Sequence, residues 1–202
     1  MAPASRTEIR NTGVVIPNIC FGTSALGDMP DTYTYEVSET RAVETIKSIL
    51  MSDYAFLDCS RNYGMGRSEE RIGKAINELG GLPQGAIIST KLDRNMETGL
   101  FDAGEARRSI EESLSTMGVD SVDILHLHDP EHAESLGPVT SDGGAIDELF
   151  KMREEGICKV VGLAAGNVEV MIPILKDNDF DILITHNRHT CLLYTSPSPR
   201  DS

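Results

Sequence analysis

Four polar side chains lie at places where they could act together on a carbonyl or alcohol. Asp58, Lys91 and His128 each end a short apolar run, and Tyr63 follows Asp58 by five residues. In a barrel of alternating strands and helices, the carboxyl ends of the strands converge on one rim, where catalytic groups sit. A tyrosine, a lysine, a carboxylate and a histidine that meet there can move a proton to or from a substrate oxygen.

The four residue types divide the work of such a reaction between them. When a hydride moves between a carbon and a nicotinamide ring, the oxygen on that carbon must gain or lose a proton, and Tyr63 can exchange it. The ammonium of Lys91 is predicted to lower the pKa of this phenol from its ordinary value of about 10. Asp58 can keep Lys91 protonated and oriented, and His128 can donate a hydrogen bond to the substrate oxygen.

The order of the expected elements indicates how these residues are positioned. Alternation of apolar and polar residues and helical spacing predict strands at 18–22, 55–58, 86–91, 121–128, 158–163 and 180–185, and helices at 38–52, 67–79, 103–117, 144–155 and 167–176. Alternating βα units imply a parallel sheet, and their regular recurrence fits an α/β chain of the (β/α)8 TIM barrel type, which has about 250 residues. A doubly wound sheet is the alternative, but the glycine-rich phosphate loop expected after its first strand is missing.

Six βα units account for the chain, so we expect a barrel truncated after about six units. Residues 1–190 are then one incomplete barrel, with 1–17 as an N-terminal hairpin cap that turns at Asn11-Thr12-Gly13. The Pro/Ser-rich residues 191–202 resemble the translation of a sequencing-library adapter, and we expect them to be a non-native tail. On this interpretation the chain is an inactive fragment of a longer protein.

Composition narrows the class of partner and the compartment. With 18 Lys and Arg against 32 Asp and Glu, the net charge of −14 argues against nucleic acid and anionic membranes. The first residues lack the apolar core of a signal peptide, and no apolar run is long enough to span a membrane. The four cysteines show no Cys-x-x-Cys spacing, which favours buried thiols in a reducing cytoplasm. We read Cys59 as a packing residue rather than a nucleophile.

Three stretches together resemble the aldo-keto reductase family. The stretch 57–73 carries an aspartate, a Tyr-Gly pair five residues later, then Ser-Glu and a glycine, as in that family's signature. Ser89-Thr90-Lys91 is similar to its third-strand lysine, and His128-Asp129-Pro130 to its fourth-strand histidine. The resemblance covers residues 13 to 190 and is closest to the branch of dehydrogenases acting on sugars such as L-fucose or D-threo-aldoses.

The resemblance implies a barrel that binds NAD(P)(H) without a Rossmann domain. It implies Tyr63 as general acid/base, Lys91 and Asp58 as the pair that tunes it, and His128 as the orienting donor. The residues it places at the cofactor are Gly22, Thr23, Asp58, Asn167 and His186. The family's usual Ser-Asn pair is here Gly166-Asn167. The expected substrate is a small aldose or other carbonyl compound, oxidised at C1 or reduced.

Two other functions stay open at this point. The same fold could serve as a non-catalytic, nucleotide-sensing subunit. His126 and His128 share one face of a strand, and with Asp129 and His132 they could belong to a metal-dependent hydrolase. Because no second His/Asp pair with ligand spacing appears before His186, we expect no metal, and we expect His126 in the core below the rim.

Overall fold

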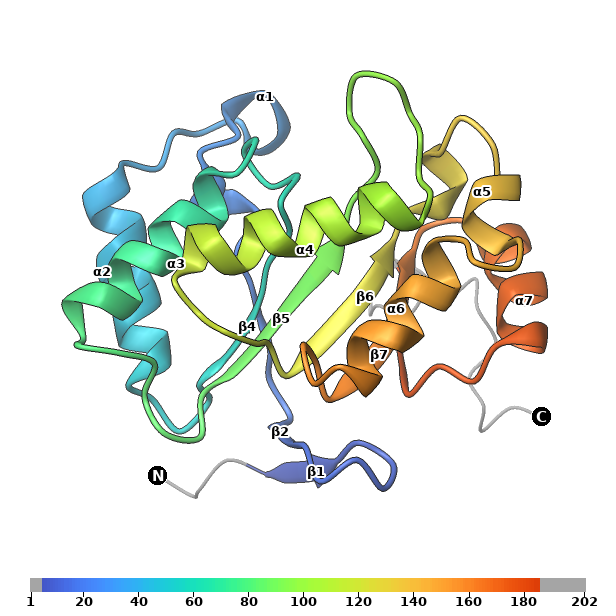
Figure 1. Ribbon diagram of the computed structural model, residues 1–202. Helices are drawn as coiled ribbons and strands as arrows, with labels where there is room; N and C mark the ends of the chain where they lie inside the picture. Colours follow the sequence, from blue (N-terminus) through green and yellow to red (C-terminus); the bar gives the residue numbers. More distant parts are fainter. Residues whose placement is uncertain (1–4, 186–202) are drawn as a thin grey trace, which may run out of the picture.

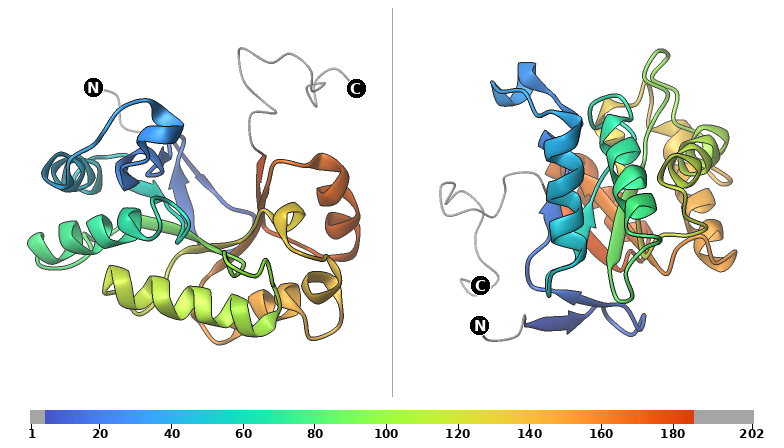
Figure 2. Two further views of the ribbon diagram at one scale, coloured as in Figure 1. Left: turned by 90° about the horizontal axis from the view of Figure 1, so that it is seen from above. Right: turned by 90° about the vertical axis from the view of Figure 1, so that its left-hand side faces the viewer.

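The molecule is a curved parallel sheet with helices on its outer side and a hairpin at one end (Figures 1 and 2). The computed structural model describes residues 5–185. His186, predicted at the cofactor, and the tail 191–202 lie outside the described residues.

The elements follow one another in strand-helix order. The strands are β1 Arg6–Glu8, β2 Val15–Pro17, β3 Phe21–Gly22, β4 Phe56–Asp58, β5 Ile87–Leu92, β6 Ile124–His128, β7 Val160–Ala165 and β8 Ile182–Thr185. The helices are α1 Pro30–Tyr33, α2 Glu39–Leu50, α3 Arg67–Glu78, α4 Ala103–Met117, α5 Gly137–Thr140, α6 Ala145–Glu154 and α7 Val168–Asp177, with 3-10 turns η1 Ala25–Gly27 and η2 Pro130–His132. Each long predicted helix and each predicted strand is present, with ends that coincide or differ by up to three residues.

The main sheet has the order β3-β4-β5-β6-β7-β8, and every neighbouring pair is parallel. Each strand therefore lies beside the strand of the next βα unit, as in a (β/α)8 barrel. Seen from above, the sheet curls as part of a barrel wall, with the long helices outside it (Figure 2). The prediction of a barrel of about six βα units is confirmed for the described residues.

The helices begin and end where the sequence supplies caps. Ser38 accepts a hydrogen bond from the backbone of Arg41 at the start of α2, and Asp102 accepts one from Glu105 at the start of α4. Gly118 ends α4 in the left-handed conformation, which glycine adopts without strain. The buried faces of these helices and the outer side of the sheet form one continuous apolar core, to which Ile46, Ile72 and Ile110 contribute fully buried side chains.

A second, smaller apolar cluster fills the barrel interior at the amino ends of the strands. Phe56, Ile87, Ile124 and Val160 come from four consecutive strands and pack against Ile9 and Val14 of the N-terminal hairpin. The hairpin pairs Arg6 with Pro17 in an antiparallel register and lies below the amino ends of the strands (Figure 1). The predicted hairpin cap is thus present and closes this end of the interior.

Candidate active site

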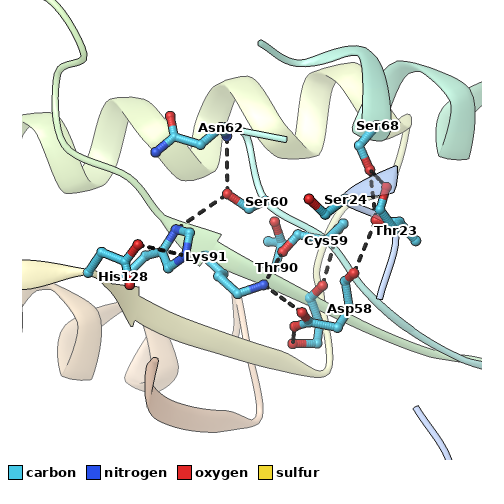
Figure 3. A network of polar contacts seen from close by, with 12 residues as sticks. Thr23, Ser24, Asp58, Cys59, Ser60, Asn62, Ser68, Thr90, Lys91 and His128 are labelled. Carbon is cyan, nitrogen blue, oxygen red and sulfur yellow. Dashed lines mark hydrogen bonds and ion pairs between the residues drawn. The ribbon is translucent and has the colours of Figure 1, made fainter. Parts of the chain in front are cut away.

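The rim at the carboxyl ends of β4, β5 and β6 holds a buried ion pair. The Lys91 ammonium, 2% exposed, donates to Asp58 Oδ2 at 2.7 Å and to the carbonyl oxygen of Cys59 at 2.6 Å (Figure 3). Ser89 Oγ donates to the other carboxylate oxygen of Asp58 at 2.9 Å. Burial alone lowers the pKa of Lys91, but the charge of Asp58, followed by the interactions with Tyr63, outweighs it and raises the pKa overall. Lys91 is therefore held as a cation, as predicted.

Tyr63 reaches this pair from the loop between β4 and α3. The Lys91 ammonium lies 4.7 Å from the centre of the phenol ring. The loop is held against the segment after β3, because Arg67 donates to the carbonyl oxygens of Gly27 at 2.9 Å and Asp28 at 2.7 Å. Gly64, at φ 64°, lies so close to Gly27 that a Cβ there would overlap its carbonyl group. Only glycine fits at this contact, and it places the half-buried Tyr63 beside the ammonium.

The predicted direction of the Tyr63 pKa is wrong for the protein without ligands. Burial raises the pKa of the phenol above 10, and this effect exceeds the lowering by the Lys91 charge. The Asp58 carboxylate adds to the rise. The sequence places the ammonium correctly beside the ring, but it does not reveal how much water the site excludes. Tyr63 is therefore protonated at neutral pH, the form that can donate a proton to a carbonyl oxygen.

His128 completes the group from the end of β6. Its ring meets that of Tyr63 edge to face, with ring centres 6.1 Å apart. Its Nδ1 lies 2.5 Å from Asp93 Oδ1, and its Nε2 lies 3.6 Å from Asp129 Oδ2. Asp93, directly after β5, is buried, as is His128. The four predicted residues are therefore neighbours, three of them at strand ends and Tyr63 in the loop after β4.

The four side chains open into one cleft with a volume of about 560 Å³. Its lining also includes Tyr33, Arg94, Asp129, His132 and the small residues Ala164 and Ala165 of β7. The size is within the range of sites for small molecules, and the lining combines apolar surface with a few converging polar groups.

The residues predicted at the cofactor lie at three different places. Gly22 is exposed at the end of β3, with open space where a side chain would begin. Thr23 is fully buried, and its hydroxyl donates to the carbonyl oxygen of Asp58 at 3.0 Å and meets Ser68 Oγ at 2.7 Å (Figure 3). Asn167 caps α7 by accepting from Glu169 and is not among the residues that line the cleft. Cofactor contacts of these residues stay predictions.

Two residues with other possible roles belong to the packing. His126 is buried in the barrel interior against Gly162, where a Cβ would overlap its Nδ1, and burial lowers its pKa to about 3. Cys59 points into the apolar layer, where its thiol donates to the carbonyl oxygen of Ser89 at 3.1 Å. Burial raises the pKa of this thiol well above its usual value, so Cys59 is no nucleophile. Within residues 5–185 no cluster of three His, Cys, Asp or Glu residues has the geometry of a metal site.

Sequence reasoning missed several polar residues around His128, chiefly Asp93, Ser60, Asn62 and Arg94. Asp93 follows Lys91 by two residues, so both side chains face the same side of the strand. The register of β5 against β6 sets Lys91 beside His126 and Leu92 beside Leu127. One further step along that register places Asp93 opposite His128. Alternation together with a parallel register was the signal that could have revealed this contact.

Comparison with known proteins agrees with this arrangement. The pattern of the aldo/keto reductase family matches residues 18–201. An L-galactose dehydrogenase of Arabidopsis thaliana is 33% identical over 174 residues, which are 85% of this chain and 52% of that protein. The chain belongs to the aldo/keto reductase family. It spans about half the length of the curated relatives it matches.

Other relatives differ in their described roles. A D-threo-aldose 1-dehydrogenase of a Pseudomonas species is 25% identical over 89% of this chain and 59% of its own length. A protein of Arabidopsis thaliana described as a probable voltage-gated potassium channel subunit beta is 38% identical over 73% of this chain and 49% of its own length. The relatives of this chain therefore include a protein whose name is not that of an enzyme.

Solved structures confirm the fold. The holo form of an aldo-keto reductase from Bacillus halodurans has a TM-score of 0.72 and 20% identity, and covers 90% of this chain and 57% of its own. A Bombyx mori aldo-keto reductase in complex with NADP has a TM-score of 0.68 and 20% identity, and covers 91% of this chain and 57% of its own. In the described part of the chain, no helix is long and apolar enough to cross a bilayer.

Proposed function

We propose that the protein is an NAD(P)-dependent oxidoreductase that reduces a carbonyl or oxidises an aldose at C1, with Tyr63 as general acid/base. The observation that supports this most is the meeting of Tyr63, Lys91, Asp58 and His128 in one cleft. Each member has a neighbour that fixes its position, which is the arrangement that efficient proton transfer requires.

The residues present fit a nicotinamide cofactor by their chemistry. The cleft offers a proton donor, a buried cation and a hydrogen-bond donor, but none of these groups can give or take a hydride. Aldo-keto reductases use NAD(P)H, and a nicotinamide supplies the hydride when bound. Gly22, Asp58 and, at the amino end of α7, Asn167 are the residues of this chain that we propose to hold it. Thr23 supports the same wall from within.

The proposed roles follow from the geometry of the cleft. In reduction, Tyr63 donates its proton to the substrate oxygen, and the adjacent Lys91 ammonium stabilises the phenolate that remains. Asp58 balances the charge of Lys91 and keeps its ammonium beside the ring. His128, whose ring lies beside that of Tyr63, hydrogen-bonds the same substrate oxygen. In oxidation, the phenolate takes the proton back.

An aldose is the proposed substrate class, because two relatives are described as sugar dehydrogenases. The polar side chains of Arg94, Asp129 and His132 in the lining of the cleft suit a hydroxylated molecule. We also propose the cytoplasm as its location, since all cysteines among the described residues are free thiols, as in a reducing compartment.

Replacement of Tyr63 by Phe tests the proposal. The kinetic measurements use the chain extended to the full length of its relatives, because residues 1–202 span about half of that length and are expected to be inactive by themselves. We expect kcat with NAD(P)H or NAD(P) and a panel of aldoses to fall by about 10²- to 10⁴-fold, with cofactor affinity by calorimetry unchanged. Tyr54→Phe, which removes the same hydroxyl near the opposite end of β4, serves as the matched control and should keep wild-type turnover. Normal turnover in Tyr63→Phe contradicts the role of Tyr63.

The similarity to the potassium channel subunit gives a second candidate, a nucleotide-binding regulatory subunit. The same experiment separates the two. Cofactor binding by the wild-type protein without turnover of any carbonyl or aldose favours the regulatory role, and turnover that depends on Tyr63 excludes it as the whole function.

A further inference from the structure

The environment of His128 Nδ1 consists of hydrogen-bond acceptors. Asp93 Oδ1 lies 2.5 Å away, and Ser60 Oγ lies 3.4 Å away. The Ser60 hydroxyl donates its own proton to Asp93 Oδ2 at 2.7 Å, so toward the ring it offers only a lone pair. Since neither neighbour can give a proton to Nδ1, the nitrogen itself must carry one.

Asp93 is built as a carboxylate rather than as a carboxylic acid. It is 3% exposed, and its oxygens accept from Ser60, from the Asn62 backbone N–H at 3.1 Å and from Asn62 Nδ2 at 2.8 Å, besides the contact with His128. Burial alone raises the pKa of Asp93, but the charge of His128 and these hydrogen bonds lower it overall. A carboxylate with this many donors has no position left for a proton of its own.

The other ring nitrogen also faces a carboxylate. His128 Nε2 points toward Asp129 Oδ2 at 3.6 Å, and both residues line the cleft. A neutral ring with its proton on Nδ1 has a bare lone pair on Nε2, which the Asp129 oxygen repels. A ring protonated on both nitrogens satisfies Asp93 and is attracted to Asp129.

We propose that Asp93 is a positioning residue that holds His128 as an imidazolium, with Nδ1–H on Asp93 and Nε2–H presented to the substrate oxygen. The inference rests on the proposed function, because it concerns how His128 acts in that reaction. It adds a charge that His128 alone does not have, and a charge-assisted hydrogen bond is roughly twice as strong as a neutral one.

The other charged groups around the ring act in both directions. The Lys91 ammonium and the Arg94 guanidinium oppose a second cation in the cleft, whereas the Asp58 carboxylate favours it. His126, which lies below His128 on β6, is neutral because burial lowers its pKa to about 3. Asp93 is the group in direct contact with the ring, so we assign to it the decisive effect.

The Asp93→Asn substitution separates charge from shape. The amide keeps the size of the side chain, and its oxygen can accept from Ser60 Oγ and the Asn62 backbone N–H. Asn62 Nδ2, which donates to the same oxygen that contacts His128, loses its acceptor. Its NH₂ group can face His128 Nδ1, so the ring becomes neutral with its proton on Nε2. Such a ring still donates to the substrate oxygen, but without the charge.

Long-range ¹⁵N–¹H spectra of the histidine rings read this state directly and do not depend on turnover. At neutral pH we expect both nitrogens of His128 to be protonated in the wild-type protein and only Nε2 in Asp93→Asn, with the signals assigned from a His128→Asn variant. We expect kcat for carbonyl reduction to fall roughly ten- to a hundredfold, with cofactor affinity unchanged. Asp123→Asn, the same change at the other end of β6, is the matched control and should leave both readouts at wild-type values.

Three results overturn the proposal. They are a wild-type His128 with a single ring proton, an Asp93→Asn variant whose ring stays doubly protonated, and a neutral ring in the variant with unchanged kcat. If the protein has no turnover at all, the spectra still decide the charge of His128, and only the proposed function fails.

Discussion

The two ends of the barrel interior are built from opposite kinds of residue on the same strands. At the amino ends, Phe56, Ile87, Ile124 and Val160 form an apolar layer closed by the hairpin. At the carboxyl ends, two to four residues further along three of these strands, the interior is occupied by Asp58, Lys91 and His128. Packing holds one end together, and hydrogen bonds between buried charges hold the other. Burying charged groups at the carboxyl end lowers the stability of the fold, but these groups can take part in a reaction.

Two histidines on β6 mark the boundary between these ends. His126 and His128 are two residues apart and point to the same side of the strand. His126 has no hydrogen-bond partner for its Nδ1 among the described residues and is neutral, whereas His128 has a carboxylate at 2.5 Å. A distance of two residues along β6 therefore separates a histidine that packs in the core from one that is placed for chemistry.

The largest effect that separates the ends is expected from Lys91→Met. Without the ammonium, no positive charge from Lys91 opposes the rise that burial causes in the pKa of Tyr63. We therefore expect kcat to fall at least about a hundredfold. The Asp58 carboxylate loses its partner at 2.7 Å, so the free energy of unfolding should drop by about 3 kcal/mol. Steady-state kinetics and urea unfolding measure the two quantities.

The double variant Asp58→Asn/Lys91→Met is the control for this prediction. It removes both charges, so most of the lost stability should return while activity stays lost. A double variant as unstable as the single one would mean that the pair holds the rim together for structural reasons, and the contrast between the two ends would disappear.

A smaller effect, on stability alone, is expected at the apolar end. Ile124 is fully buried, and Ile124→Ala should lower the free energy of unfolding by about 3 kcal/mol while kcat of the folded protein stays the same. Val15→Ala, in the hairpin at the same end but 43% exposed, is the comparison and should change stability by less than about 1 kcal/mol. A loss of kcat in Ile124→Ala comparable with that in Lys91→Met would show that the ends are coupled.

The fold was predictable because it depends on patterns that repeat within short windows. The amphipathic stretch at 103–117 coincides with α4, and the apolar run at 86–91 differs from β5 by one residue at each end. The four-residue helices α1 and α5 were not predicted, since one turn is too short to show a helical period.

The site was predictable only in part, for a different physical reason. Asp58, Tyr63, Lys91 and His128 could be placed because strand ends and a family motif mark them. The role of Asp93 depends on donors from Ser60 and Asn62, which lie about thirty residues earlier in a loop. Such a network exists only once the loop is folded. The predicted direction of the Tyr63 pKa was wrong for a similar reason, because the burial of a side chain depends on the whole folded chain.

The smallest effect concerns a carboxyl group that belongs to neither end. Glu69 of α3 is fully buried between helices and sheet, where Thr90 Oγ1 donates to its Oε1 at 2.7 Å. Burial raises its pKa from 4.5 to about 7. Between pH 4.5 and about 7 the folded state keeps a proton that the unfolded state releases, so the free energy of unfolding falls as pH rises, by at most about 3 kcal/mol.

Glu69→Gln removes this titration but keeps the acceptor for Thr90. Urea unfolding across this pH range should therefore show a flatter profile for Glu69→Gln than for the wild type. Glu70→Gln, on the exposed side of the same helix, should retain the wild-type slope. Equal slopes for all three proteins would mean that Glu69 is ionised at little cost, and that buried charge outside the rim is tolerated as well as charge within it.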